Sequence, residues 1–177
     1  MDQNGTLRDA LLATVEQLQK AAPDTAQAVF TARTELIERV LTRAHVRQFG
    51  LDVDEPPSLG GTDQGPNPVE LVLAALGTCQ EIVYAAYSAV LGIPLDSVRV
   101  TVRGTLDPRG LFGVAQVPAG FSDIRCEVEL VSPAATEDVT RLTEIVEARC
   151  PVLDILRRPV PVRTTIALNG RDLAPPR

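Results

Sequence analysis

The sequence predicts an α+β protein organised around one long central helix, and three stretches of the chain indicate this. Residues 68–91 are almost entirely apolar, and Glu70 and Glu81 are the only charged residues among them. Residues 98–106 and 124–130 each alternate apolar and polar side chains, which is typical of half-buried strands. At 177 residues the chain is long enough for one domain with a sizeable core.

The predicted helix over 68–91 starts well, because proline is tolerated at the first helical position. The run is long enough to span a bilayer. However, Gln80 and Glu81 lie at its centre and no Lys or Arg flanks it closely, so we interpret it as the buried helix of a soluble protein, with no membrane partner. One side of this helix is small and weakly polar, which suits close approach by another helix or a partner subunit. Its residues are Glu70, Ala74, Gly77, Glu81, Ala85 and Ser88.

The N-terminal third is less regular. Leucines recur at helical spacing between Leu7 and Leu18, which predicts a helical extension over residues 1–22 with Thr6 as its N-cap. Residues 24–41 allow either a helix, which the pattern slightly favours, or a strand from Gln27 to Ile37.

Residues 41–53 predict a single strand with three basic groups on one of its faces. That face consists of Leu41, Arg43, His45, Arg47, Phe49, Leu51 and Val53. Either the charged end of this face reaches solvent at a sheet edge, or Arg43 or Arg47 points inward beside a reactive group. We interpret His45 as a structural, hydrogen-bonded side chain.

The C-terminal half continues the α+β pattern. The two alternating stretches predict an antiparallel hairpin in which Cys126 fills the core. A helix follows over 136–149 and stops at Cys150, because a residue before proline avoids helical geometry. A short helix from Pro151 to Leu156 then points its amides at Cys150, which can lower the pKa of that thiol. A last strand over 160–168 and a loop tail complete the prediction.

Composition restricts the function classes. A net charge of −6 argues against nucleic acid as a partner. One histidine and three cysteines without metal-ligand spacing predict no metal site, and the absence of glycine-rich phosphate loops predicts no nucleotide cofactor. The N-terminus does not read as a signal peptide, so we expect a reducing cytoplasm. In that compartment a cysteine pair is redox-active rather than structural.

Two motifs together are more specific: a cysteine inside a helix that follows a GG…NPxEL segment, and a CPV at a helix junction some seventy residues later. The chain resembles the OsmC/Ohr family of thiol proteins in these motifs. The matching residues are Gly60, Gly61, Asn67, Pro68, Leu71, Ala74, Ala75, Cys79, Cys150, Pro151 and Val152. The resemblance implies a family core over 27–168, with strands at 27–37 and 39–53. It also implies an intertwined homodimer, in which antiparallel sheets wrap two long central helices and the active sites lie at the subunit interface.

The resemblance further implies a thiol peroxidase of organic hydroperoxides. Cys79 attacks the peroxide and becomes a sulfenic acid, Cys150 resolves it to a disulfide, and a dithiol reductant, lipoyl or thioredoxin-like, completes the cycle. The reaction requires an ionised thiol. Cys79 lies too far from its helix N-terminus for the helix dipole to help, so we predict that Arg43, in preference to Arg47, supplies the compensating charge.

One position departs from the family pattern. The peroxidases carry a glutamate directly after the proline of NPE, hydrogen-bonded to a catalytic arginine, whereas this chain has Val69 there and its glutamate at position 70. Glu70 faces away from Cys79 on a continuous helix. The departure favours an alternative function: a protein of the same fold that binds or scavenges a small hydrophobic ligand without efficient turnover, in which both cysteines are ordinary core residues.

Overall fold

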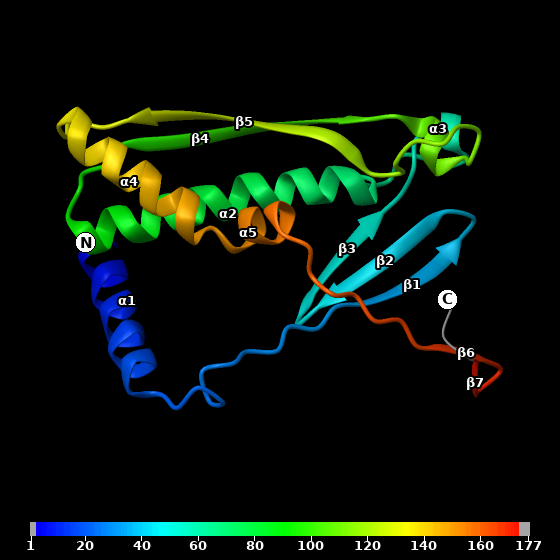
Figure 1. Ribbon diagram of the computed structural model, residues 1–177, viewed down its shortest axis with the longest axis horizontal. Helices are drawn as coiled ribbons and strands as arrows, with labels where there is room; N and C mark the ends of the chain where they lie inside the picture. The colour runs from blue at the N-terminus through cyan, green and yellow to red at the C-terminus, as the bar shows by residue number, and fades with distance from the viewer. Residues whose placement is uncertain (1–2, 174–177) are drawn as a thin grey trace.

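The computed structural model describes residues 3–173, and helix α2 (Pro68–Leu91) is the axis of the protomer (Figure 1). Strands β4 (Ser97–Leu106) and β5 (Phe121–Val131) form an antiparallel pair along one side of α2. Helices α4 (Thr136–Arg149) and α5 (Pro151–Arg157) pack against α2 as well. The predicted α+β class, central helix, hairpin and 136–149 helix are therefore confirmed.

The boundaries of α2 follow from its sequence. The Asn67 side chain accepts a hydrogen bond from the Glu70 amide, and the Glu70 carboxylate accepts one from the Asn67 amide, which makes a capping box. Gly92 ends the helix with φ 68°, a left-handed conformation that glycine adopts without steric cost. By length and composition alone α2 could also cross a membrane. In the protomer it instead lies against β4, α4 and α5.

The small side of α2 contacts a strand of the same chain. A Cβ on Gly77 would stand 3.4 Å from the Val102 side chain, which is an ordinary van der Waals distance, so β4 packs directly on the helix at this position. Glu81 Oε1 accepts a hydrogen bond from the Val100 amide at 3.2 Å. The expectation that this side faces another helix or a partner subunit is therefore wrong at Gly77 and Glu81. The element that packs there is a strand of the same chain, which a small and weakly polar helix face accommodates as well.

Two clusters of buried side chains form the core between α2, helices α4 and α5, and the β4–β5 hairpin. One joins Tyr84 and Ile93 to Leu142 and Val146 of α4. The second joins Leu76 of α2 to Cys150 and Leu153 at the start of α5. Together they fix α4 and α5 relative to the middle of the central helix.

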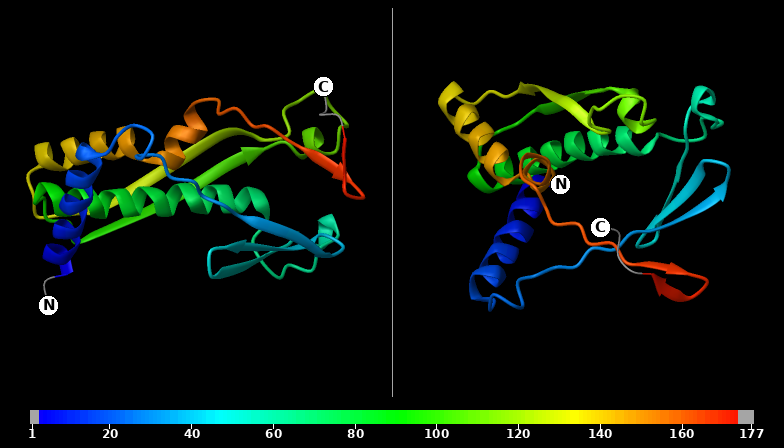
Figure 2. Two further views of the ribbon diagram at one scale, coloured as in Figure 1. Left: turned by 90° about the horizontal axis from the view of Figure 1, so that it is seen from below. Right: turned by 45° about the vertical axis from the view of Figure 1, so that its right-hand side comes forward.

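A separate antiparallel sheet precedes α2 and stands apart from it (Figures 1 and 2). Its strands are β1 (Arg33–Glu38), β2 (Leu41–Val46) and β3 (Phe49–Val53). The helix predicted over 24–41 is therefore wrong, and of the alternative strand over 27–37 only the part from Arg33 is regular. The local pattern fits both structures, so the pairing of β1 with β2 decides between them.

The single strand predicted over 41–53 is also wrong, because the chain reverses at Arg47 and Gln48. Arg47 adopts φ 54°, which a sequence pattern does not signal for arginine. Leu51 then pairs with Ala44, and Val53 pairs with Thr42. Directly paired residues share a face, so Leu51 and Val53 lie on the face opposite Arg43.

The loop from β3 to α2, which includes the 3₁₀ helix Pro57–Leu59, is held by one carboxylate. Asp54 is 2% exposed. It accepts hydrogen bonds from the Thr62 amide and hydroxyl at 2.9 and 2.8 Å, and from the amides of Glu55 and Gln64. Burial acts to raise the pKa of Asp54, but these hydrogen bonds outweigh it and lower the pKa to about 2.

The ends of the described chain differ from their predictions in detail. Helix α1 (Gln3–Lys20) begins before Thr6, so Thr6 is not its N-cap. In the C-terminal part only β6 (Ile166–Leu168) of the predicted 160–168 strand forms, paired with β7 (Arg171–Leu173), and residues 174–177 of the predicted tail lie outside the described residues. Helix α3 (Pro108–Leu111) lies in the long connection before β5.

The protomer exposes far more surface than a compact chain of its mass. Its accessible surface is 13639 Å², whereas a compact 19.0 kDa monomer exposes about 8400 Å². One face of α2 contributes to the excess. This face, called here the open face, consists of Ala75, Thr78, Ile82 and Ala85.

Candidate active site

Two cysteines from distant parts of the chain meet beside α2. Cys79 lies in the middle of α2, and Cys150 lies at the junction between α4 and α5. Their sulfur atoms are 3.2 Å apart, and the Cys150 thiol donates a hydrogen bond to Cys79 Sγ. Both side chains pack in the cluster of Leu76 and Leu153. The two cysteines are thus core residues and neighbours at once.

The junction that carries Cys150 is set by the following proline. Pro151 removes an amide and disfavours helical geometry in Cys150, so α4 stops and α5 starts in a new direction. Cys150 is 1% exposed. Burial raises the pKa of its thiol, and hydrogen bonds from the amides of Leu153 and Val152 oppose the rise without cancelling it. The amides contact the sulfur as expected, but the expected net lowering of the pKa is wrong because burial dominates.

Cys79 lies at the border between the packed and open sides of α2. Its side chain is partly exposed, next to the open face. Position 69, where the resemblance places a glutamate, holds an exposed valine. Glu70 is engaged at the start of the helix, where its Oε2 lies 2.8 Å from the Asn67 amide. The carboxylate at position 70 is thus committed to the capping box.

Arg43 is held by a carboxylate on the next strand. Its Nε and Nη2 donate to Asp52 Oδ1 and Oδ2 at 2.7 and 2.8 Å, a two-pronged pair on the half-exposed face of the sheet. The hydrogen bond from Arg43 lowers the pKa of Asp52. Within residues 3–173 of one protomer, no described interaction joins Arg43 to Cys79. Arg47 lies over the Phe49 ring at 5.1 Å, and His45 Nε2 lies 3.9 Å from Glu35 Oε1.

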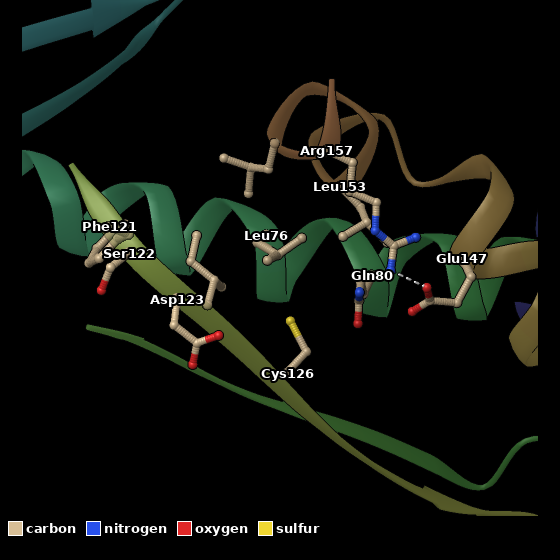
Figure 3. A pocket seen from close by; sticks show the side chains of 11 residues that line it. Leu76, Gln80, Phe121, Ser122, Asp123, Cys126, Glu147, Leu153 and Arg157 are labelled. Atoms are coloured by element: carbon tan, nitrogen blue, oxygen red, sulfur yellow. Dashed lines mark hydrogen bonds and ion pairs between the residues drawn. The ribbon is translucent and has the colours of Figure 1, made fainter. Parts of the chain in front are cut away.

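A cavity of about 450 Å³ lies on the other side of this cluster, between α2, β5 and α5 (Figure 3). Gln80, Cys126, Glu147 and Arg157 line it, and the sequence analysis did not place any of them in a site. Gln80 Oε1 is fully buried and accepts no hydrogen bond, which costs about 1–3 kcal/mol when no ligand or water compensates. A lone glutamine inside an apolar helix was the available signal. Among the described residues, no group of His, Cys, Asp and Glu could hold a metal ion.

An α+β fold that brings a thiol of its central helix against a thiol at a helix junction defines a two-cysteine thiol protein. The chain belongs to the OsmC-like protein family, whose profile matches residues 61–165. This confirms the resemblance drawn from the sequence. Comparison with curated proteins gave no significant match.

Solved structures share the fold at low sequence identity. An OsmC-like protein from Mycoplasma pneumoniae superposes with a TM-score of 0.64 at 20% identity, covering 74% of this chain and 89% of the other. An organic hydroperoxide resistance protein OsmC from Legionella pneumophila gives 0.57 at 20% identity over 75% and 91%. A Vibrio cholerae protein named for organic hydroperoxide resistance, with captopril in one of its active sites, gives 0.56 at 17% identity over 86% and 99%.

Proposed function

We propose that this protein is a cysteine-based peroxidase of organic hydroperoxides, in which Cys79 reacts with the peroxide and Cys150 resolves the product. The observation that carries the proposal is the 3.2 Å separation of the two sulfur atoms. A disulfide needs about 2.05 Å between sulfurs, so a small movement of α5 suffices to form the bond. The family and the names of its solved members support the choice of substrate.

The steps balance as follows. The Cys79 thiolate attacks the outer peroxide oxygen, an S–O bond forms, the O–O bond breaks, and the departing alkoxide takes a proton to leave as an alcohol. The Cys150 sulfur then attacks the sulfenic sulfur of Cys79, and water leaves. Until that moment the raised pKa keeps Cys150 protonated, and its S–H donates a hydrogen bond to the Cys79 sulfur. A lipoyl or thioredoxin-like dithiol of the cytoplasm reduces the disulfide.

A second copy of the chain completes the molecule in this proposal. The protomer has about 5200 Å² more surface than a compact chain of its mass. Large apolar side chains of the first sheet, such as Leu36 and Ile37, are exposed. Among the described strands, none pairs with the outer edges of β4 and β5, and long unpaired edges promote association. An intertwined homodimer accounts for all three features, because it covers the open face of α2 and gives the sheets partners.

The second copy is also the source of the missing cation. In the proposed dimer the sheet that carries Arg43 lies against the Cys79 of the other protomer. Asp52 then supplies the carboxylate partner that the resemblance places at position 69, where this chain has Val69. The pair Arg43–Asp52 stays together, so Arg43 keeps its orientation without a helix-borne glutamate.

Stopped-flow oxidation with cumene hydroperoxide tests the proposal. We expect fast consumption of one equivalent of peroxide per protomer and a Cys79–Cys150 disulfide in the mass spectrum. Cys79→Ser should abolish the fast phase, whereas Cys150→Ser should keep it and accumulate a sulfenic acid that dimedone traps. Oxidation of the wild type no faster than that of free cysteine contradicts the proposal and favours the alternative, a ligand-binding protein without turnover.

A further inference from the structure

The cavity beside the cysteine cluster has the size and lining of a ligand site. At about 450 Å³ it falls within the roughly 300–1000 Å³ typical of small-molecule pockets. Its lining is mixed: apolar side chains from α2, β5 and α5 stand beside polar and charged ones (Figure 3). The apolar members are Leu76, Phe121, Ile124, Leu153 and Leu156. Neither Cys79 nor Cys150 lines it, so it is separate from the place where a peroxide meets the reactive sulfur.

One buried polar group in the wall lacks a partner. Gln80 is 2% exposed, and its Oε1 accepts no hydrogen bond from the described residues. Gln80 lines the cavity, and a half-turn about its last side-chain bond exchanges the positions of oxygen and nitrogen, which brings the oxygen to the place that the amide nitrogen holds. A molecule in the cavity that carries an O–H or N–H group can therefore donate to Gln80. A wall with an apolar part and one unpaired acceptor fits a molecule with an apolar part and one donor.

The charges at the cavity exclude an anionic ligand. Arg157 Nη2 lies 2.6 Å from Glu147 Oε2, and both side chains are about half exposed, so they form the solvent side of the cavity. Asp123 is paired with Arg125 at 2.8 Å. The one cation in the lining, Arg157, is paired with Glu147, and Asp123 is paired with Arg125, so the lining holds no unpaired positive charge. A fatty acid or a phosphate has no free cation to meet there.

We infer that this cavity binds a neutral organic molecule with an apolar part, which donates one hydrogen bond, from a hydroxyl or an amide N–H, to Gln80. The site goes beyond the proposed peroxidase reaction and does not depend on it, because the two reactive sulfurs lie outside its lining. Leu76 and Leu153 line the cavity and also pack against Cys150, so a molecule in the cavity contacts the side chains that hold α5 on α2.

The third cysteine gives a direct test. The chain has three cysteines, so the double variant Cys79→Ser/Cys150→Ser leaves Cys126, which lines the cavity, as its single thiol. Burial raises the pKa of Cys126, so labelling by iodoacetamide is followed by mass spectrometry at mildly alkaline pH. We expect 2-phenyl-2-propanol to slow the labelling at least fivefold at saturation. Cumene, which has the same body without the hydroxyl, should need a roughly three- to tenfold higher concentration.

Variants of Gln80 isolate the hydrogen bond. In Gln80→Leu on the same background, both probes should protect Cys126 at similar concentrations, because the side chain keeps its volume and loses its acceptor. Gln80→Met serves if the leucine variant does not fold. Three results overturn the inference: no protection by the alcohol, equal protection by alcohol and cumene in the presence of Gln80, or equal protection by the anion 2-phenylpropanoate. Since the double variant cannot turn over, these outcomes are independent of whether the peroxidase proposal survives.

Discussion

Replacing Ile82 with alanine is the sharpest test of the proposed dimer. Ile82 is 68% exposed at the centre of the open face of α2. Full burial of an isoleucine side chain is worth about 1.5–3 kcal/mol, so covering the exposed two thirds contributes about 1–2 kcal/mol. A twofold dimer contains the contact twice, which gives about 2–4 kcal/mol per dimer. The dissociation constant should therefore rise between roughly 30- and 700-fold.

Sedimentation equilibrium over a concentration series measures this change. Alanine is the best helix former, so the substitution leaves α2 intact and the loss is assigned to association. Leu18→Ala is the matched control, because Leu18 is a comparably exposed apolar residue on α1 rather than on the open face. A wild-type chain that is monomeric at micromolar concentration, or an Ile82→Ala dimer as tight as wild type, refutes the reasoning.

Three further predictions address stability and the cation. Leu142 is fully buried between α4 and α2, so Leu142→Ala should lower the free energy of unfolding by about 2–5 kcal/mol in urea titrations. Asp54 has a pKa of about 2 in the folded protein, against an ordinary value of 3.8. Its ionised carboxylate therefore stabilises the fold fully above pH 3.8, and this stabilisation is lost as the pH falls through 2. Asp54→Asn should flatten the pH dependence of the melting temperature between these two pH values. Arg43→Met should slow peroxide consumption about tenfold and leave the dimer folded, while Arg47→Met should react like wild type. If only Arg47→Met is slow, the cation is Arg47. If neither variant is slow, the thiolate is not stabilised by an arginine.

The sequence predicted those elements whose ends are marked by local signals or whose pairing partner has a matching pattern. The helix over 68–91 has a proline start, a capping box and a glycine stop, and the 98–106 and 124–130 stretches pair with each other. The first sheet was harder because its reversal depends on Arg47 in a left-handed conformation, where glycine or asparagine is the usual signal. Of the strand predicted over 160–168, only Ile166–Leu168 is regular, because only these residues have a partner strand. A periodic sequence pattern does not tell whether a partner strand is present.

The candidate site likewise has features that the sequence predicted and features that only the folded structure shows. Cys79 and Cys150 were paired through the resemblance, and only the packing of α5 on α2 brings their sulfurs to 3.2 Å. Gln80 was visible in the sequence as a polar residue in an apolar run, but its unpaired oxygen is a property of the folded interior. Position 126 was predicted as core, and Cys126 does pack near Leu76 while also lining a cavity. A periodic pattern predicts on which face of a strand a side chain lies, but it does not predict whether that side chain borders a cavity.

The long separation of the two thiols along the chain affects how easily they can be re-reduced. Cys79 and Cys150 are 71 positions apart, so a disulfide between them closes a large loop in the unfolded chain. Loop closure of that size stabilises the folded protein by about 4 kcal/mol. By the same amount, the disulfide is harder to reduce in the folded protein than in the unfolded chain. This corresponds to a reduction potential that is lower by about 90 mV in the folded protein. In the proposed reaction cycle the reductant must overcome this stabilisation, and local opening around α5 would reduce the free energy that the reduction requires.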